Sequence, residues 1–156
     1  MSAKVFVDTN VLVYCRDASE PEKQTRAAAW MEALWKGRSG CLSYQVLQEF
    51  YITVTAKLDP GLEPDAARRD IRALLSWQPL PVDTRTLEGA WLLQDRYGFS
   101  WWDALIVAAA QAAGCRYLLS EDFQVGMEVG ELRVINPFQV APEDLGIVGG
   151  GGEPER

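Results

Sequence analysis

Histidine is absent from this 156-residue sequence, and its absence removes several kinds of chemistry. Without histidine there can be neither Ser-His-Asp or Cys-His catalysis nor a zinc site built on imidazole. Acid–base or electrostatic work must therefore be done by carboxylates, lysines, tyrosines, or a metal ion with its bound water.

Cysteine is scarce, and long hydrophobic runs are missing. The three cysteines (Cys15, Cys41 and Cys115) are an odd number without metal-ligand spacing, and no signal peptide precedes them. We expect reduced thiols that pack as small hydrophobic groups in a cytoplasmic protein. The longest apolar run, residues 104–110, is too short to cross a bilayer, so we expect no membrane association.

Positive charge is also in deficit, since the net charge is −7. This balance argues against a general polyanion binder. Residues 143–156 contain four acids and one arginine, so part of the charge belongs to the C-terminal end. The net charge of the rest of the chain equals the charge of the four acids considered below. Two divalent cations would neutralise these four acids. A nucleic-acid substrate is therefore compatible with the composition, provided that local arginines assist.

Short apolar segments alternate with helical patterns along the chain. We expect strands at 4–7, 40–43, 80–82, 116–119 and 133–135, and helices at 21–35, 45–57, 63–75, 84–97 and 100–113. This alternation predicts an α/β fold whose mainly parallel sheet is covered by helices on both faces. We expect one domain over residues 1–140, followed by an acidic, glycine-rich, disordered tail over 141–156.

Four carboxylates stand where apolar runs break. Asp8 ends the first strand, Glu49 lies within the 45–57 helix, Asp103 opens the apolar run 104–110, and Asp122 follows the 116–119 strand. Ligands of parallel sheets bind outside the carboxyl ends of the strands, so we expect these acids to converge. Converging carboxylates repel unless a cation lies between them, and oxygen-only ligands favour Mg²⁺ or Mn²⁺.

Each acid also has a purely structural interpretation. Asp8 can cap the following helix, and Asp103 forms a capping-box pattern with Ser100. Asp122 can be a turn residue whose neighbour Glu121 faces solvent. Against the capping interpretation, Asp103 is the only charge on an otherwise apolar helix, and such a helix is buried.

Glu49 is the acid that capping does not explain. It falls outside the apolar stripe of its helix and beside a second face that is too apolar to be simply solvated, formed by Ile52, Thr53 and Ala56. This position is better explained if Glu49 lines a functional site than if it lies on the solvated surface. Trp101 and Trp102 cannot both face the same way, so one of them is expected near the site or at a dimer contact.

Four segments at these positions resemble the motif blocks of the PIN-domain ribonucleases, and in particular the VapC-type toxins of bacterial toxin–antitoxin pairs. The segments are 7–12 (VDTNVL), 45–50 (QVLQEF), 100–106 (SWWDALI) and 119–122 (LSED), and 132–138 (LRVINPF) resembles the end of the family's domain. The match runs in order from residue 4 to residue 138.

The resemblance implies a three-layer α/β/α sandwich with a central, mainly parallel, five-stranded sheet. It implies endoribonuclease activity with Mg²⁺ or Mn²⁺, a homodimer, and a small inhibitory antitoxin as partner. Single-stranded or looped RNA is the expected substrate. Carried over position by position, it implies catalytic and metal-binding roles for Asp8, Glu49, Asp103 and Asp122, which Asn10 and Ser120 orient.

Two other classes remain open. A catalytically silent module of the same fold would bind RNA or a protein partner without cleaving. A phosphotransfer domain would use Asp8 as a nucleophile, but haloacid-dehalogenase-like sites require a second aspartate where this chain has Asn10. A receiver-like domain would require paired acids before the phosphorylated one, which are absent.

Overall fold

A five-stranded sheet forms the centre of the computed structural model, which describes residues 3–147. The strands are β1 (Val5–Val7), β2 (Gly40–Cys41), β3 (Tyr117–Leu119), β4 (Glu128–Val129) and β5 (Leu132–Ile135). Their order is β2-β1-β3-β5-β4, and only β4 runs antiparallel to its neighbour. The first strand of the chain therefore lies inside the sheet, between strands that follow it by more than thirty and more than a hundred residues.

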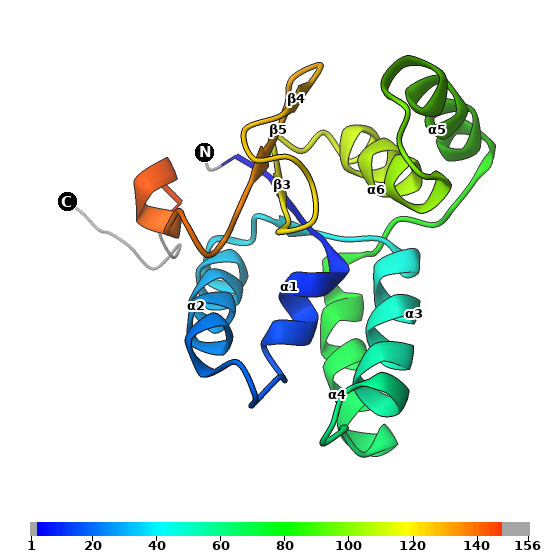
Figure 1. Ribbon diagram of the computed structural model, residues 1–156. Coiled ribbons are helices and arrows are strands. Elements are labelled where there is room, and N and C mark those ends of the chain that lie inside the picture. Colours follow the sequence, from blue (N-terminus) through cyan, green and yellow to red (C-terminus); the bar gives the residue numbers. More distant parts are fainter. Residues whose placement is uncertain (1–2, 148–156) are drawn as a thin grey trace.

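Helices cover both faces of the sheet, which gives the expected α/β/α sandwich (Figure 1). The helices α1 (Thr9–Tyr14), α2 (Pro21–Gly37), α3 (Tyr44–Ile52) and α4 (Pro64–Leu74) lie together on one side. The pair α5 (Thr84–Tyr97) and α6 (Trp101–Ala112) packs on the other. A π-helical turn, Thr53–Lys57, continues α3, and 3₁₀ turns occupy Leu75–Trp77 and Pro142–Leu145.

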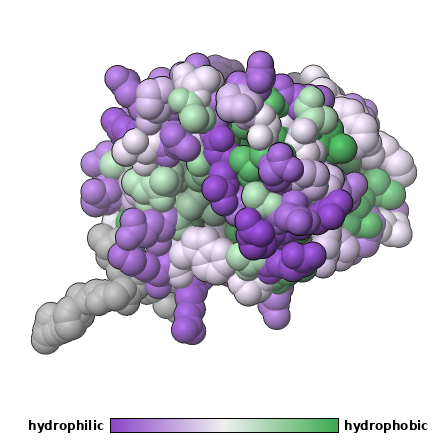
Figure 2. All heavy atoms as spheres, turned by 90° about the horizontal axis from the view of Figure 1, so that it is seen from below, coloured by the Kyte–Doolittle hydropathy of each residue, from purple (hydrophilic) through white to green (hydrophobic). Residues whose placement is uncertain are grey.

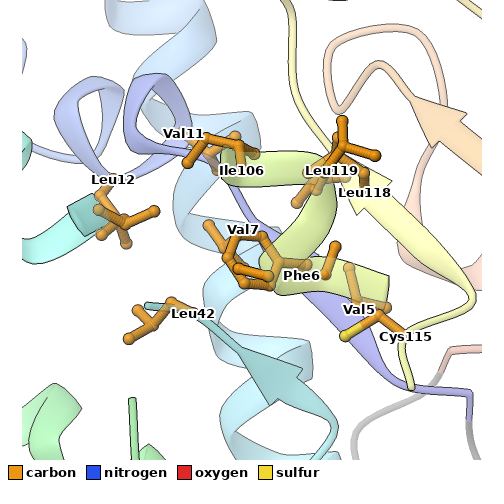
Figure 3. Close-up of a cluster of buried hydrophobic side chains, with 14 of the residues drawn as sticks. Val5, Phe6, Val7, Val11, Leu12, Leu42, Ile106, Cys115, Leu118 and Leu119 are labelled. Carbon is orange, nitrogen blue, oxygen red and sulfur yellow. The ribbon is translucent and has the colours of Figure 1, made fainter. Parts of the chain in front are cut away.

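The core includes the whole of β1, whose three residues are completely buried. Figure 3 shows the side chains of β1 beside Leu118 and Leu119 of β3, Ile106 of α6 and Val11 of α1. An uninterrupted apolar strand is what a sheet buried on both faces requires. Because β1 and β3 are held by this core, the residues that follow them are held as well.

Local signals explain several helix boundaries. Ser43, Asp83 and Ser100 accept hydrogen bonds from amides in the first turns of α3, α5 and α6. Helix α5 ends at Gly98, which has a left-handed conformation (φ 72°) that glycine adopts without strain. The helix predicted at 84–97 has these bounds in the structure.

Two strand predictions need correction. Residues 80–82 form no strand, only a single bridge between Leu80 and Ser43, because Pro79 and Pro81 lack the amide donors of a ladder. The missed strand is β4, which is two residues long. It pairs with β5 across a tight turn at Gly130 (φ 61°), a Gly-x hairpin signal that the sequence contained.

Trp30 lies on the buried face of α2, whereas Ala28 and Trp35 are exposed. The Trp30 Nε1–H donates to the carbonyl oxygens of Pro137 (3.2 Å) and Val140 (2.9 Å). Trp30 therefore ties α2 to the segment that follows β5.

The C-terminal segment packs on the domain as far as the structure describes it. The turn Pro142–Leu145 lies against α2, and Ile147 is 2% exposed. The remainder of the expected tail lies outside the described residues. Seen from below in Figure 2, the surface is mostly hydrophilic, with separate hydrophobic patches between the polar groups. Within residues 3–147, no helix has the length and apolar character needed to span a membrane.

Candidate active site

Two of the four acids follow neighbouring parallel strands. Val7 at the end of β1 is in register with Leu119 at the end of β3. Asp8 and the 120–122 segment therefore leave the sheet at the same edge, as the strand-end rule predicts. Asp8 is 6% exposed, whereas Asp122 is exposed.

A single amide joins these two acids. The Asn10 Nδ2 atom donates to Asp8 Oδ2 (3.3 Å), Asp122 Oδ2 (3.1 Å) and Ser120 Oγ (3.1 Å). Its Oδ1 accepts from the backbone amide of Glu121 at 3.2 Å, which fixes the amide's orientation. Fully buried Ser120 donates its hydroxyl hydrogen to Asp8 Oδ2 (2.7 Å) and accepts from the Asp122 amide (3.1 Å). Asn10 and Ser120 thus orient both carboxylates.

Glu49 reaches the cluster from α3. Its Oε1 accepts from the Thr9 hydroxyl at 2.7 Å, and its Oε2 accepts from the Gln45 Nε2–H at 3.1 Å. Gln45 also donates to the carbonyl oxygen of Trp102 at 3.3 Å, next to Asp103 on α6. The hydrogen bonds of Glu49 and Gln45 therefore connect α3 with α6 and with the segment after β1.

Asp103 lies in the first turn of α6 and is half-buried. Its backbone amide donates to the Ser100 hydroxyl at 3.1 Å, so the residue takes part in capping α6. Burial raises the pKa of Asp103, and the charges of Asp122 and Glu49 raise it further, against the Ser100 hydrogen bond. The charges of Asp122 and Glu49 therefore act on both Asp8 and Asp103.

The pKa of Asp8 is raised more strongly than that of Asp103. Burial is the main cause that raises the pKa of this carboxyl to about 6, and the charges of Asp122 and Glu49 act in the same direction. Hydrogen bonds from Ser120 and Thr9 oppose the shift. The ion pairs of the described chain involve other acids, so no described cation offsets this repulsion.

Sequence reasoning overlooked two members of the cluster. Thr9 and Gln45 both bind Glu49, and neither was singled out. Gln45 had a readable signal, since residues four apart on a helix share a face. Glu121, which the turn interpretation of Asp122 placed in solvent, is half-buried; it is ion-paired with Lys23 of α2 (2.6 Å) and hydrogen-bonded to Tyr14 of α1.

The donor set suits a hard divalent cation, but a complete ligand cage is not preformed. Among residues 3–147, no three acidic or cysteine side chains are grouped tightly enough to hold a metal ion. Mg²⁺ typically keeps several waters and needs only one or two direct carboxylates. The carboxylate oxygens of these acids, which have no described cationic partner, therefore fit such an ion, and water would supply its remaining ligands.

Comparisons with known proteins agree with this architecture. A family model of the PIN domain matches residues 5–125. A search of curated proteins finds no match. Among solved structures, a toxin–antitoxin complex from Klebsiella pneumoniae aligns with 16% identity and a TM-score of 0.57, covering 86% of this chain and 98% of that chain.

Two further solved structures share the fold. The FitAB complex bound to an IR36 DNA fragment aligns with 20% identity and a TM-score of 0.66, covering 87% of this chain and 96% of that chain. VapBC2 from Rickettsia felis, bound to a DNA fragment from their promoter, aligns with 16% identity and a TM-score of 0.55, covering 83% and 96%. At these identities the similarity establishes the fold.

Proposed function

The chain belongs to the PIN-domain family, and from this premise we propose that it is an endoribonuclease that uses Mg²⁺ or Mn²⁺ to hydrolyse RNA phosphodiester bonds. Two observations support the proposal: the Asn10 amide hydrogen-bonds both Asp8 and Asp122, and the charges of Asp122 and Glu49 raise the pKa of both Asp8 and Asp103. None of these acids takes part in an ion pair of the described chain. An idle cluster of repelling acids would only cost stability.

In this proposal the four acids hold the metal, directly or through its waters. A bound divalent ion lowers the pKa of a water molecule and neutralises charge on the phosphate. Asn10 and Ser120 keep the carboxylates of Asp8 and Asp122 in fixed orientations. Thr9 and Gln45 do the same for Glu49, so that little reorganisation is needed when substrate arrives.

The biological context we propose is that of a toxin with an antitoxin partner. Three solved structures with this fold are toxin–antitoxin or FitAB complexes, two of them bound to DNA fragments. We propose a small inhibitory protein as the partner and a homodimer as the assembly. A neighbouring small gene that encodes a DNA-binding protein would support the first, and light scattering of the purified chain tests the second.

Cleavage of a mixed RNA pool by the purified protein tests the activity. We expect cleavage with Mn²⁺, none with EDTA, and at least about a hundredfold loss in Asp8→Asn, because one member of a charge-stabilising site is removed. The matched control is Asp95→Asn, the same change at an exposed position of α5. Equal cleavage by Asp8→Asn and the wild-type protein would exclude this site.

A silent binding module is the second candidate, and the absence of a preformed metal cage in residues 3–147 favours it. Thermal melting with and without Mn²⁺ distinguishes the two. A module of this kind shows no Mn²⁺-dependent rise in melting temperature and no cleavage of any RNA. A rise in the wild-type protein that Asp8→Asn lacks favours the nuclease, since ligands that bind only the folded state stabilise it.

A further inference from the structure

A groove of about 620 Å³ adjoins the acids between α3 and α6. Glu49 belongs to both the groove and the acid cluster, so the two are continuous. Away from Glu49 the lining becomes apolar and aromatic, with Ile52, Trp101 and Trp102 in the wall. Exposed Lys57 also lines the groove, and it makes no ion pair within the described part of the chain.

Trp102 is a large aromatic residue of this wall that is exposed to solvent. It is 61% exposed, although it directly precedes Asp103. Its neighbour Trp101 is half-buried and stacks on Trp91, with ring centroids 6.2 Å apart. The Trp102 carbonyl accepts from Gln45, which also binds Glu49, so the backbone that carries this ring is fixed relative to the acids. A large aromatic ring that is exposed to solvent beside a polar site is suited to stacking on a planar ligand.

We infer that this groove is a subsite for an unpaired RNA nucleotide, whose base stacks on Trp102; the inference rests on the proposed function and names a binding determinant for it. Every base has a flat face that an exposed aromatic ring can cover, without need for a particular sequence. A base held inside a duplex cannot offer that face to the ring.

The charges along the groove match a nucleic-acid strand. At one end, Glu49 joins the acids that would receive the scissile phosphate through a metal. Lys57 lies eight residues further along α3 and its π-helical turn, roughly 12 Å at helical rise, where it can meet a neighbouring phosphate. The acid for the metal and the ammonium for a further phosphate lie on the α3 side of the groove, and the aromatic ring for the base lies on the α6 side.

The test measures binding without cleavage. Asp8→Asn serves as the background, in EDTA, with a fluorescently labelled oligoadenylate of about ten nucleotides and anisotropy as the readout. Trp102→Leu, which keeps apolar bulk but removes the ring, is expected to weaken binding about tenfold or more. Trp102→Phe, which restores an aromatic face, should bind within about threefold of the background. Trp35→Leu removes an exposed tryptophan outside the groove and should leave binding unchanged.

Two further measurements sharpen the result. Lys57→Gln should reduce the slope of log affinity against log salt by about 0.7, the value for one phosphate contact on a single strand. A duplex of the same length should bind the background and its Trp102→Leu variant alike, because its bases are stacked on one another. Thermal melting confirms that Trp102→Leu folds, as its exposure leads us to expect.

Other outcomes overturn the inference. Equal binding by Trp102→Leu and the background, or no binding of oligoadenylate by the background, rules out the subsite. A change in oligomeric mass with unchanged RNA affinity would identify the groove as a contact between copies of this chain. Because this test measures binding and not cleavage, RNA binding that depends on Trp102 would support the subsite even if the protein had no nuclease activity. If the protein proves to be a nuclease but Trp102→Leu does not change RNA binding, the subsite is refuted and the proposed function stands.

Discussion

At the scale of single residues, Asp8 combines a structural and an electrostatic role. Its Oδ1 accepts from the Thr9 amide at 2.7 Å, as a helix cap does, while its Oδ2 meets Ser120 and Asn10. Capping and participation in a site are therefore divided between the two oxygens of one carboxylate. The sequence presented them as alternatives because it does not reveal which oxygen faces which neighbour.

The raised pKa of Asp8 predicts a pH-dependent stability. The folded protein holds this proton up to about pH 6, whereas the unfolded chain loses it near pH 4. The metal-free protein should therefore lose on the order of 3 kcal/mol of unfolding free energy as the pH rises from about 3 to about 7. Urea unfolding in EDTA across this range measures the loss. Asp8→Asn should show a smaller decrease, and an identical decrease in both proteins would contradict the assignment to Asp8.

Thr9 predicts a separation of activity from stability. Thr9→Val keeps the shape of the side chain but removes the hydroxyl that Glu49 accepts from. Cleavage should slow by about tenfold, in keeping with the roughly 1.5–3 kcal/mol typical of a hydrogen bond to a charged group. Thr25→Val, which removes an exposed hydroxyl bond to the Pro21 carbonyl on α2, is the matched control. Equal loss of activity in both variants would show that Thr9 has no special part.

The acids were easier to predict than their supporting partners. Asp8 and Asp122 are marked by the strand ends before them, because a buried apolar run followed by an acid is a local pattern. The bond from Thr9 to Glu49 joins residues forty positions apart and depends on the packing of α1 against α3. Such a partnership leaves no local trace in one sequence.

At the scale of elements, α5 offers two glycines with opposite expected effects. Gly89→Ala should raise the unfolding free energy by about 0.5–1 kcal/mol, because the new Cβ would meet the Ala108 Cβ at an ordinary 3.7 Å within a helix. Gly98→Ala should lower it by about 1 kcal/mol, because φ at this position is 72°. Chemical denaturation of both variants checks the pair, and the same sign in both would refute this account of the helix.

The helices were predicted better than the strands for a physical reason. Caps at Asp83 and Ser100 and a left-handed glycine at Gly98 are local features that can be read directly. A strand is defined by its partner, and segment 80–82 failed because the prolines around Leu80 limit pairing to one bridge. The hairpin of β4 was missed since its two residues are too few to show alternation.

At the scale of the whole molecule, the C-terminal segment closes the core beyond the predicted domain boundary at residue 140. Ile147 is 2% exposed and belongs to the buried cluster. Ile147→Ala should lower the unfolding free energy by about 2–4 kcal/mol, as for other buried large-to-small changes. Val125→Ala, at a residue 52% exposed, should change it by less than about 0.5 kcal/mol. Similar denaturation midpoints for the two variants would place residue 147 outside the core.

The central position of β1 has a consequence for how the protein comes into being. The strand that precedes Asp8 is synthesised first, yet its neighbour β3 and the acid at residue 122 are more than a hundred residues away in the chain. A ribosome must release most of the polypeptide before these two carboxylates can meet. A prematurely terminated product that lacks β3 therefore cannot bring Asp8 and Asp122 to the same edge of the sheet.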